Sequence, residues 1–143
     1  MLEFFEKKDN NFLPLTELVT AHNGYTGGSY EKVFYIKNNS NTNFYTDISV
    51  LIVFPPSEKP APDLYTKTGW SVKAKYGSEQ PSEEEWSSIN VNASLNIPDI
   101  GKVGLSDTTT HHPIWVRVYC PGYTDPTIKD DVSIQISYIE KEI

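Results

Sequence analysis

Apolar and polar residues alternate with a period of two along most of the chain. In residues 70–76 (WSVKAKY), for example, Val72 and Ala74 share one face while Lys73 and Lys75 share the other. Such alternation is typical of β-strands, and clusters of Asn, Ser, Thr, Gly and Pro separate the runs as turns do. The pattern predicts strands over residues 31–38, 46–54, 70–76, 89–97, 114–120 and 132–139, with residues 12–19 as a weaker candidate for a first strand.

The two faces of each run indicate how the strand is covered. Residues 70–76 and 89–97 each have one apolar and one polar face, as half-buried antiparallel strands do. Residues 46–54 are apolar on both faces, because Leu51 and Val53 lie opposite the main apolar row, so we expect both faces to be covered. About seven strands without a long helical period predict an all-β fold, a single antiparallel β-sandwich of immunoglobulin-like type.

The length of 143 residues is that of one domain. We assign residues 1–18 to an N-terminal arm or a first edge strand and residues 19–143 to the sandwich domain.

One short helical turn is expected between two strands. Residues 80–86 (QPSEEEW) contain a capping box, with Ser82 at the N-cap and Glu85 three residues later. The acidic run then lies in the first turn, where the helix dipole stabilises negative charge, so this run is better explained by capping than by metal binding. Trp86 is expected to anchor the turn to the sheet.

The charge balance excludes one class of partner. Nineteen acidic and twelve basic residues give a net charge of -7, and Arg117 is the only arginine. Nucleic-acid binding needs clustered Lys and Arg, so we expect no nucleic-acid partner. No apolar run approaches the length of a membrane span, and the N-terminal residues lack the features of a signal peptide. We therefore expect no membrane partner and synthesis in a reducing cytoplasm.

Residues capable of catalysis or metal binding do not form a recognisable set. His111 and His112 are adjacent, so in an extended chain they project to opposite sides and do not converge on one zinc ion. Cys120 ends an apolar strand and is interpreted as a small buried hydrophobe. The aspartates 125, 130 and 131 are interpreted as solvated turn residues rather than calcium ligands, and residues 24–29 (GYTGGS) as a flexible turn. We expect no catalytic residues, cofactor or metal.

Three features are candidate contacts with a partner. Aromatic and arginine side chains share one strand face and could form an interface patch, although packing over the sheet also explains them. Four prolines make residues 55–63 a stiff loop, and large apolar residues precede the first confident strand. These contact candidates are Trp115, Arg117 and Tyr119; Pro55, Pro56, Pro60 and Pro62; and Leu2, Phe4 and Phe5, of which the last three are expected to dock on a neighbouring subunit.

The order of these segments resembles that of a known class of proteins. An opening GGSYEKVFYIKNNSNTNFYTDISVLI is followed by the Trp70 strand, PSEEEW, INVNASLNI, HHPIWVRVYCPGYTDP and DVSIQISYI. Over residues 25–140 this is similar to small immunoglobulin-like sandwich proteins of tailed bacteriophage particles, which decorate capsids or act as neck, tail or baseplate adaptors. The resemblance implies a virion structural protein, made in the host cytoplasm, present in many copies or as a homo-oligomer, with other virion proteins and copies of itself as partners. It implies no enzyme activity.

Two other classes remain as alternatives. A carbohydrate-binding β-sandwich module could use Trp70, Trp86, Trp115 and Tyr123 as stacking platforms for sugars. Core packing explains most of these rings equally well. A small hydrolase with an unrecognised site is the third class.

Overall fold

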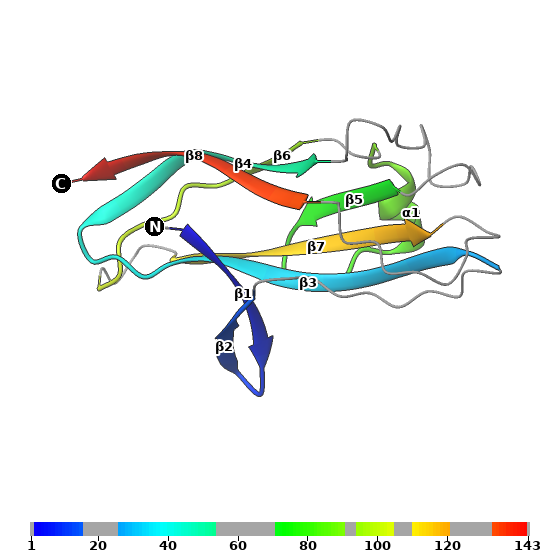
Figure 1. Cartoon of the computed structure of the whole chain (residues 1–143), viewed down its shortest axis with the longest axis horizontal. Helices are drawn as coiled ribbons and strands as arrows, with labels where there is room; N and C mark the ends of the chain where they lie inside the picture. Colours follow the sequence, from blue (N-terminus) through cyan, green and yellow to red (C-terminus); the bar gives the residue numbers. More distant parts are fainter. Residues whose placement is uncertain are drawn as a thin grey trace.

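The computed structural model describes residues 2–15, 26–53, 71–90, 94–104, 110–120 and 133–142. Its elements form two antiparallel sheets, which confirms the predicted all-β sandwich (Figure 1). The five-stranded sheet has the order β2-β1-β3-β7-β5, and the three-stranded sheet has the order β6-β4-β8. The elements are β1 (Leu2–Lys8), β2 (Asn11–Pro14), β3 (Gly28–Asn38), β4 (Asn43–Val53), β5 (Ser71–Tyr76), α1 (Glu83–Ser87), β6 (Leu95–Ile97), β7 (His111–Cys120) and β8 (Ser133–Glu142).

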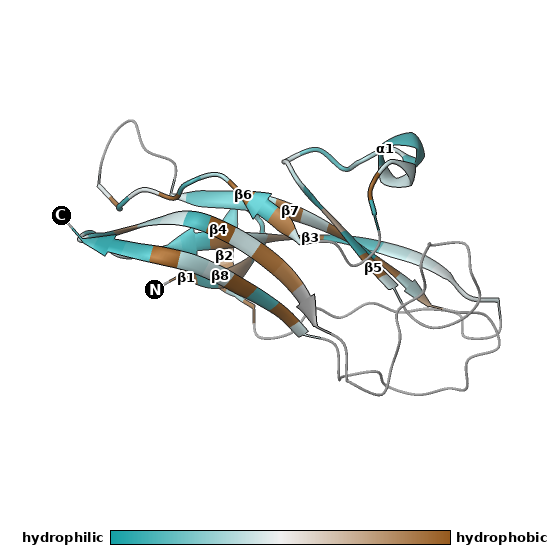
Figure 2. Cartoon of the chain, turned by 90° about the horizontal axis from the view of Figure 1, so that it is seen from above, coloured by the Kyte–Doolittle hydropathy of each residue, from teal (hydrophilic) through white to brown (hydrophobic). Residues whose placement is uncertain are grey.

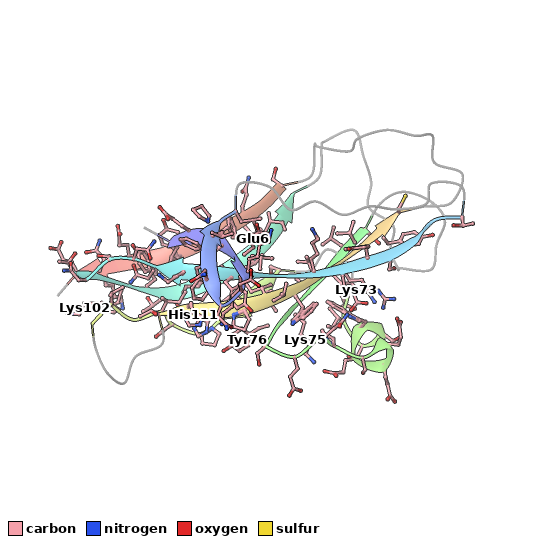
Figure 3. The ribbon with its side chains drawn as sticks, turned by 90° about the horizontal axis from the view of Figure 1, so that it is seen from below. Glu6, Lys73, Lys75, Tyr76, Lys102 and His111 are labelled. Carbon is pink, nitrogen blue, oxygen red and sulfur yellow. The ribbon has the colours of Figure 1, made fainter. Side chains whose placement is uncertain are left out.

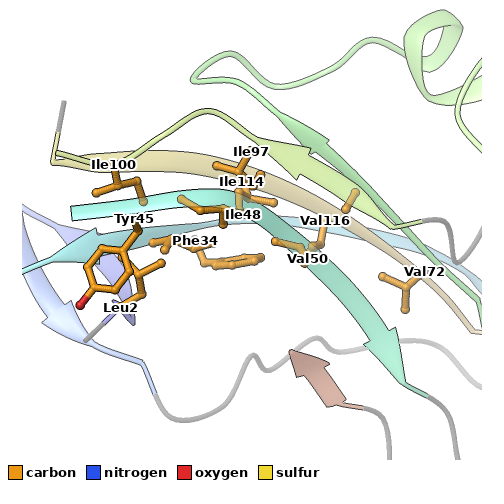
Figure 4. Packing of buried hydrophobic residues seen from close by; sticks show 12 residues of the cluster. Leu2, Phe34, Tyr45, Ile48, Val50, Val72, Ile97, Ile100, Ile114 and Val116 are labelled. Atoms are coloured by element: carbon orange, nitrogen blue, oxygen red, sulfur yellow. The ribbon is translucent and has the colours of Figure 1, made fainter. Parts of the chain in front are cut away.

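The core lies between the two sheets, where the inward rows of alternating residues meet. Figure 4 shows Tyr45, Ile48 and Val50 of β4 beside residues of the opposite sheet, and all three are at most 2% exposed. Burying each large apolar side chain contributes about 1.5–3 kcal/mol. The complete buried cluster contains Leu2, Phe34, Ile36, Tyr45, Ile48, Val50, Val72, Ala74, Ile97, Ile100, Ile114 and Val116.

The expected strand 89–97 is shorter in the structure. Only β6 is a strand within the described part of this range. The Ile89 N–H donates to the Trp86 carbonyl oxygen, so Ile89 belongs to the end of α1 rather than to a strand. Residues 91–93 lie outside the described residues.

Leu51 corrects the expectation that both faces of β4 are covered. Its side chain is 38% exposed, whereas Ile48 and Val50 of the opposite row are buried in the core. The difference arises because the described elements cover the three-stranded sheet on its inner face only. The side chain of Val53 is not among the described side chains.

The turn between β3 and β4 is organised by one buried amide. Asn38 Nδ2 donates to the carbonyl oxygens of Asn43 and Gly101, both at 2.9 Å, and Asn38 Oδ1 accepts from the Ser40 N–H. Burying a polar side chain is costly unless its hydrogen bonds are made. Asn38 therefore ties this turn to the segment that precedes β7.

A buried tyrosine fixes the end of β8 to β4. Tyr45 Oη donates to Glu140 Oε1 at 2.8 Å, and Asn43 Nδ2 donates to the same oxygen at 2.8 Å. Burial, followed by the adjacent carboxylate, raises the pKa of Tyr45 to about 12. The two hydrogen bonds hold the pKa of Glu140 below its usual range.

The N-terminal residues form a hairpin that was expected only in part. Residues 12–19 were a weak strand candidate, of which β2 is the described strand, and residues 1–18 were assigned to an arm or a first edge strand without a separate strand at β1. Asp9 and Asn10 form the two-residue turn with φ of 52° and 64°. Two positive φ values are the signature of a type I′ turn, for which Asp and Asn are suited. In Figure 1 the hairpin extends from the five-stranded sheet on the side away from β4 and β8.

Candidate functional site

The outer face of the five-stranded sheet carries two distinct groups of side chains. Strand register fixes these groups, because residues directly opposite one another share a face. Glu31 lies opposite Arg117, and Arg117 lies opposite Lys73, under α1. We call this region the helix end. We call the region beside β1 and β2 the hairpin end, which comprises Phe5, Phe12, Tyr35 and His111 with Lys7 and Lys37. Figure 3 shows His111 at the hairpin end and Lys73 at the helix end.

Trp86 anchors the helix end as the sequence predicted. Ser82 and Glu85 form the expected capping box, and the Trp86 side chain is fully buried. Its Nε1 donates to Glu31, and Lys73 Nζ donates to the Trp86 carbonyl oxygen at 2.8 Å. Lys73 is only 5% exposed, so the expected polar outer face of β5 is in fact covered by α1.

Two ion pairs connect α1 to the sheet. Arg117 donates to both carboxylate oxygens of Glu83, at 2.9 and 2.8 Å, and Lys75 pairs with Glu85. The hydrogen bonds from Arg117 hold the pKa of Glu83 below its usual range, and the hydrogen bond from Lys75 does the same for Glu85. Arg117 is 9% exposed. Its guanidinium therefore holds α1, and the expectation of an Arg117 interface patch is corrected in this respect.

The hairpin end is an aromatic cluster. Phe12 packs edge-on against Tyr35 at 5.4 Å between ring centroids and against His111 at 5.0 Å. Phe5 joins from β1, at 6.2 Å from Phe12. Edge-to-face pairs of this kind add about 0.5–1.5 kcal/mol each beyond area burial. The rings come from four strands, so the cluster ties the hairpin to β3 and β7.

Lysines lie over these rings. Lys7 Nζ is 5.4 Å from the Phe12 centroid and 5.9 Å from that of Tyr35, and Lys37 Nζ is 5.6 Å from both Phe5 and Phe12. Lys37 Nζ also donates to Asn39 Oδ1 at 2.7 Å. Among the described residues, neither lysine lies within ion-pair distance of a carboxylate. The hairpin end therefore presents two lysines on an apolar base, with one carboxylate, that of Glu3, directly opposite Lys37 on β1.

His111 is the titratable ring of this cluster. Burial lowers its pKa, and the nearby charges of Lys7, His112 and Lys37 lower it further. At neutral pH the imidazole is therefore uncharged and behaves as a fourth aromatic ring.

The adjacent histidine points to the other face, as expected from the sequence. His112 Nε2 lies 3.0 Å from the Asp99 carbonyl oxygen, and Nδ1 lies 3.2 Å from Tyr76 Oη. A carbonyl oxygen only accepts, so Nε2 carries the hydrogen and donates it. His111 and His112 do not converge, and no group of three or more possible metal ligands occurs among the described residues.

The structure corrects the expectation for the N-terminal apolar residues. Leu2 is 5% exposed within the core, and Phe5 is 6% exposed within the aromatic cluster. Phe4 packs against Phe34 at 5.4 Å between ring centroids. These residues were expected to reach a neighbouring subunit. The Asp9–Asn10 turn instead folds the segment back, and β1 pairs with β3.

The remaining sequence candidates have different outcomes. Tyr119 is buried, and Trp115 is half-buried with Nε1 donating to Ser78 at 3.4 Å. Trp86 is buried and unavailable as a sugar platform, and Cys120 is buried as predicted. The other residues that the sequence singled out lie outside the described residues: Pro55, Pro56, Pro60, Pro62, Trp70, Tyr123, and the aspartates 125, 130 and 131.

Sequence reasoning missed the hairpin end. It noted Phe5 and Phe12 as apolar residues and His111 only as a possible metal ligand, while Lys7, Tyr35 and Lys37 were not grouped with them. The available signal was the dipeptide Asp9-Asn10 between two short runs, which would have predicted a hairpin and aligned Lys7 with Phe12.

No helix in the described part of the chain has the length and apolarity needed to cross a membrane. Comparisons with known proteins found no matching family model, no similar curated protein and no matching solved structure.

Proposed function

We propose that this chain is a non-enzymatic structural subunit that binds other proteins through the outer surfaces of its sandwich. The hairpin end is the surface that best supports this role. Aromatic rings are enriched at protein interfaces, where they supply buried area, and charges at the edge of such a surface orient the partner. Neither lysine makes a direct ion pair among the described residues, so an acidic partner surface would complement them.

The placement of the reactive side chains also favours a scaffold. Arg117 and Glu83 hold α1, His112 bridges Tyr76 and a backbone carbonyl, and Tyr45 holds the end of β8. Each of these groups makes contacts that stabilise the fold.

The particle in which we place this subunit is that of a tailed bacteriophage, as a capsid decoration protein or as a neck, tail or baseplate adaptor. This part of the proposal rests on the resemblance in segment order over residues 25–140. The chain would then be made in the host cytoplasm and assembled with other virion proteins.

The proposal is tested first by the neighbouring genes and then by the particle. Capsid, portal or tail genes on either side would identify the particle, and mass spectrometry of gradient-purified particles should detect the chain. Cross-linking on those particles should join Lys7 or Lys37 to a second virion protein. If purified particles encoded by the same genome do not contain the chain, the proposal is wrong.

Matched variants locate the contact. Lys7→Glu with Lys37→Glu should reduce incorporation into particles about tenfold or more, because charges at an interface steer association and exclude mismatched partners. Lys8→Glu alters the same hairpin but lies on its other face, so it should incorporate normally. Equal incorporation of all three proteins would exclude the hairpin end as the contact. Saturable quenching of tryptophan fluorescence by a polysaccharide would favour the carbohydrate-binding alternative instead.

A further inference from the structure

His111 is the only side chain of the hairpin end that can change charge close to neutral pH. It lies directly opposite Lys37 in the pairing of β7 with β3, so both side chains are on the outer face of the sheet. The Phe12 ring packs against the imidazole at 5.0 Å between centroids, and the Tyr35 ring lies 6.2 Å away. His111 is only half-buried. A molecule that docks on the hairpin end therefore meets the imidazole together with the lysines.

Two ammonium groups lie near this imidazole. Lys37 comes from β3, and Lys7 comes from β1, where it lies directly opposite Phe12 in the hairpin. Burial lowers the pKa of His111, and Lys7, His112 and Lys37 lower it further. In the free protein the imidazole is therefore uncharged at neutral pH, because a third positive charge beside two lysines is unfavourable.

The acidic groups of the chain lie further from His111 than the lysines do. Glu3, Lys37 and His111 form one row across β1, β3 and β7, with the lysine between the other two. Glu6 lies on the other face of the hairpin, because side chains alternate along β1. On the other side of β7, strand β5 ends before it reaches His111. Figure 2 shows the acidic helix α1 well apart from β1 and β2 along the molecule, as in Figure 1.

A carboxylate brought by a partner would change this charge balance. The proposed function places an acidic surface against Lys7 and Lys37, and the imidazole lies beside both. An opposite charge within about 4–6 Å favours the charged form of a titratable group. A partner carboxylate therefore favours the protonated imidazole, and by linkage the protonated imidazole favours the partner to the same extent.

We propose that the hairpin end binds its acidic partner together with a proton, which His111 takes up, so that binding strengthens below neutral pH. This inference rests on the proposed function and adds regulation to the same surface. In the complex three cations, Lys7, Lys37 and protonated His111, face the partner's carboxylates over the aromatic base. Above neutral pH the uncharged imidazole contributes only its ring.

An NMR titration with an acidic peptide tests this coupling. The probe is a capped peptide of sequence Asp-Leu-Asp-Asp-Leu-Asp, which offers carboxylates to the lysines and leucine side chains to the rings. Its aspartates stay ionised between about pH 5.5 and about pH 7.5, because their ordinary pKa is about 3.9. The wild-type chain should bind this peptide about threefold or more tightly at the lower pH. The same peptide with Asn in place of Asp is the control, and its affinity should not rise at the lower pH.

His111→Phe retains a ring at this position but removes the titrating group. Its dissociation constant for the acidic peptide should be the same at both pH values. An equal effect of pH on the variant and on the wild-type chain would assign the proton to another group and overturn the inference.

The His111 ring of the wild-type chain gives a readout that does not depend on a variant folding. Its titration midpoint should be higher in the peptide-saturated complex than in the free chain, and amide signals of β1 and β2 should shift on binding. Binding at the hairpin end with an unmoved midpoint, or with equal affinity at both pH values, would overturn this inference and leave the proposed function standing. No shift of these amides at either pH would contradict the docking of an acidic partner itself, and this inference with it.

Discussion

The helix end and the hairpin end occupy the same face of the same sheet but are stabilised differently. At the helix end, each basic group that contacts α1 has a defined acceptor: Arg117 contacts Glu83, Lys75 contacts Glu85, and Lys73 contacts a backbone carbonyl. At the hairpin end, the lysines lie over aromatic rings and make no direct ion pair among the described residues, although Glu3 lies opposite Lys37 on β1.

This difference separates a surface whose charges are paired within the chain from one that can accept a charged partner. The helix end has opposite charges already matched, so another molecule would have to displace an existing contact. The hairpin end could gain an acidic partner without losing an ion pair. Binding is therefore expected at the hairpin end, and the helix end serves as its rigid counterpart.

The largest expected effect is the removal of the hairpin. Deleting residues 1–9 removes Leu2 from the core and Phe5 from the aromatic cluster. At about 1.5–3 kcal/mol for each buried side chain, the free energy of unfolding should fall by about 3–6 kcal/mol, measured by urea denaturation. Lys8→Ala, at the exposed end of β1, should change it by less than about 0.5 kcal/mol. A truncated chain as stable as wild type would show that β1 does not belong to the fold.

A smaller effect is expected at the helix end from Glu83→Gln. The substitution weakens the contact with the buried Arg117 guanidinium, so the melting temperature at pH 7 should fall. Because Arg117 lowers the folded-state pKa of Glu83 below its ordinary 4.5, the wild-type advantage is present above that value. It should be lost as the pH falls through the folded-state pKa, and the two melting temperatures should then converge.

Glu84→Gln is the matched control for that experiment. Glu84 lies beside Glu83 in α1 and is exposed, and Arg117 contacts only its neighbour. Its substitution should leave the melting temperature unchanged at pH 7. Equal losses from both substitutions would mean that the total acidic charge of the helix, rather than the contact with Arg117, supports the helix end.

The helix end was predictable in outline because its signals are local. The capping box of Ser82 and Glu85 is four residues long, and alternation alone placed Val72 and Ala74 on the inward face. Alternation could not reveal that α1 folds over Lys73, because that contact depends on the path between distant segments. Alternation also wrongly included Ile89 in a strand. Ile89 follows α1 in the structure, but it lies two residues before Val91 and so fits the same alternation as the strand residues.

The hairpin end was not predictable in the same way because it depends on strand register. Phe5, Phe12, Tyr35 and His111 come from four strands, and their sequence positions contain no common period. Only the order β2-β1-β3-β7 brings them together. Leu2, Phe4 and Phe5 were expected to dock on a neighbouring subunit because alternation alone does not reveal the Asp9–Asn10 turn and the pairing of β1 with β3.

The smallest expected effect tests whether the hairpin end has the charge environment described above. Burial, Lys7, His112 and Lys37 together keep the pKa of His111 below its ordinary 6.5. The unfolded chain therefore binds a proton more readily, and stability should decrease as the pH falls from above 6.5 toward the folded-state pKa. His111→Phe retains a ring but removes the titrating group, so its melting temperature should depend less on pH across that window.

The contribution of Lys7 can be isolated by an NMR titration of the His111 ring. Lys7→Met removes the second of the causes that lower the pKa of His111, so the midpoint should move up toward 6.5. Lys8→Met removes the same charge from the other face of the hairpin and should move the midpoint less. An unchanged midpoint in Lys7→Met would mean that burial and the remaining charges, without Lys7, set the pKa of His111. The lysine would then lie too far from the ring to give the hairpin end the positive field that an acidic partner requires.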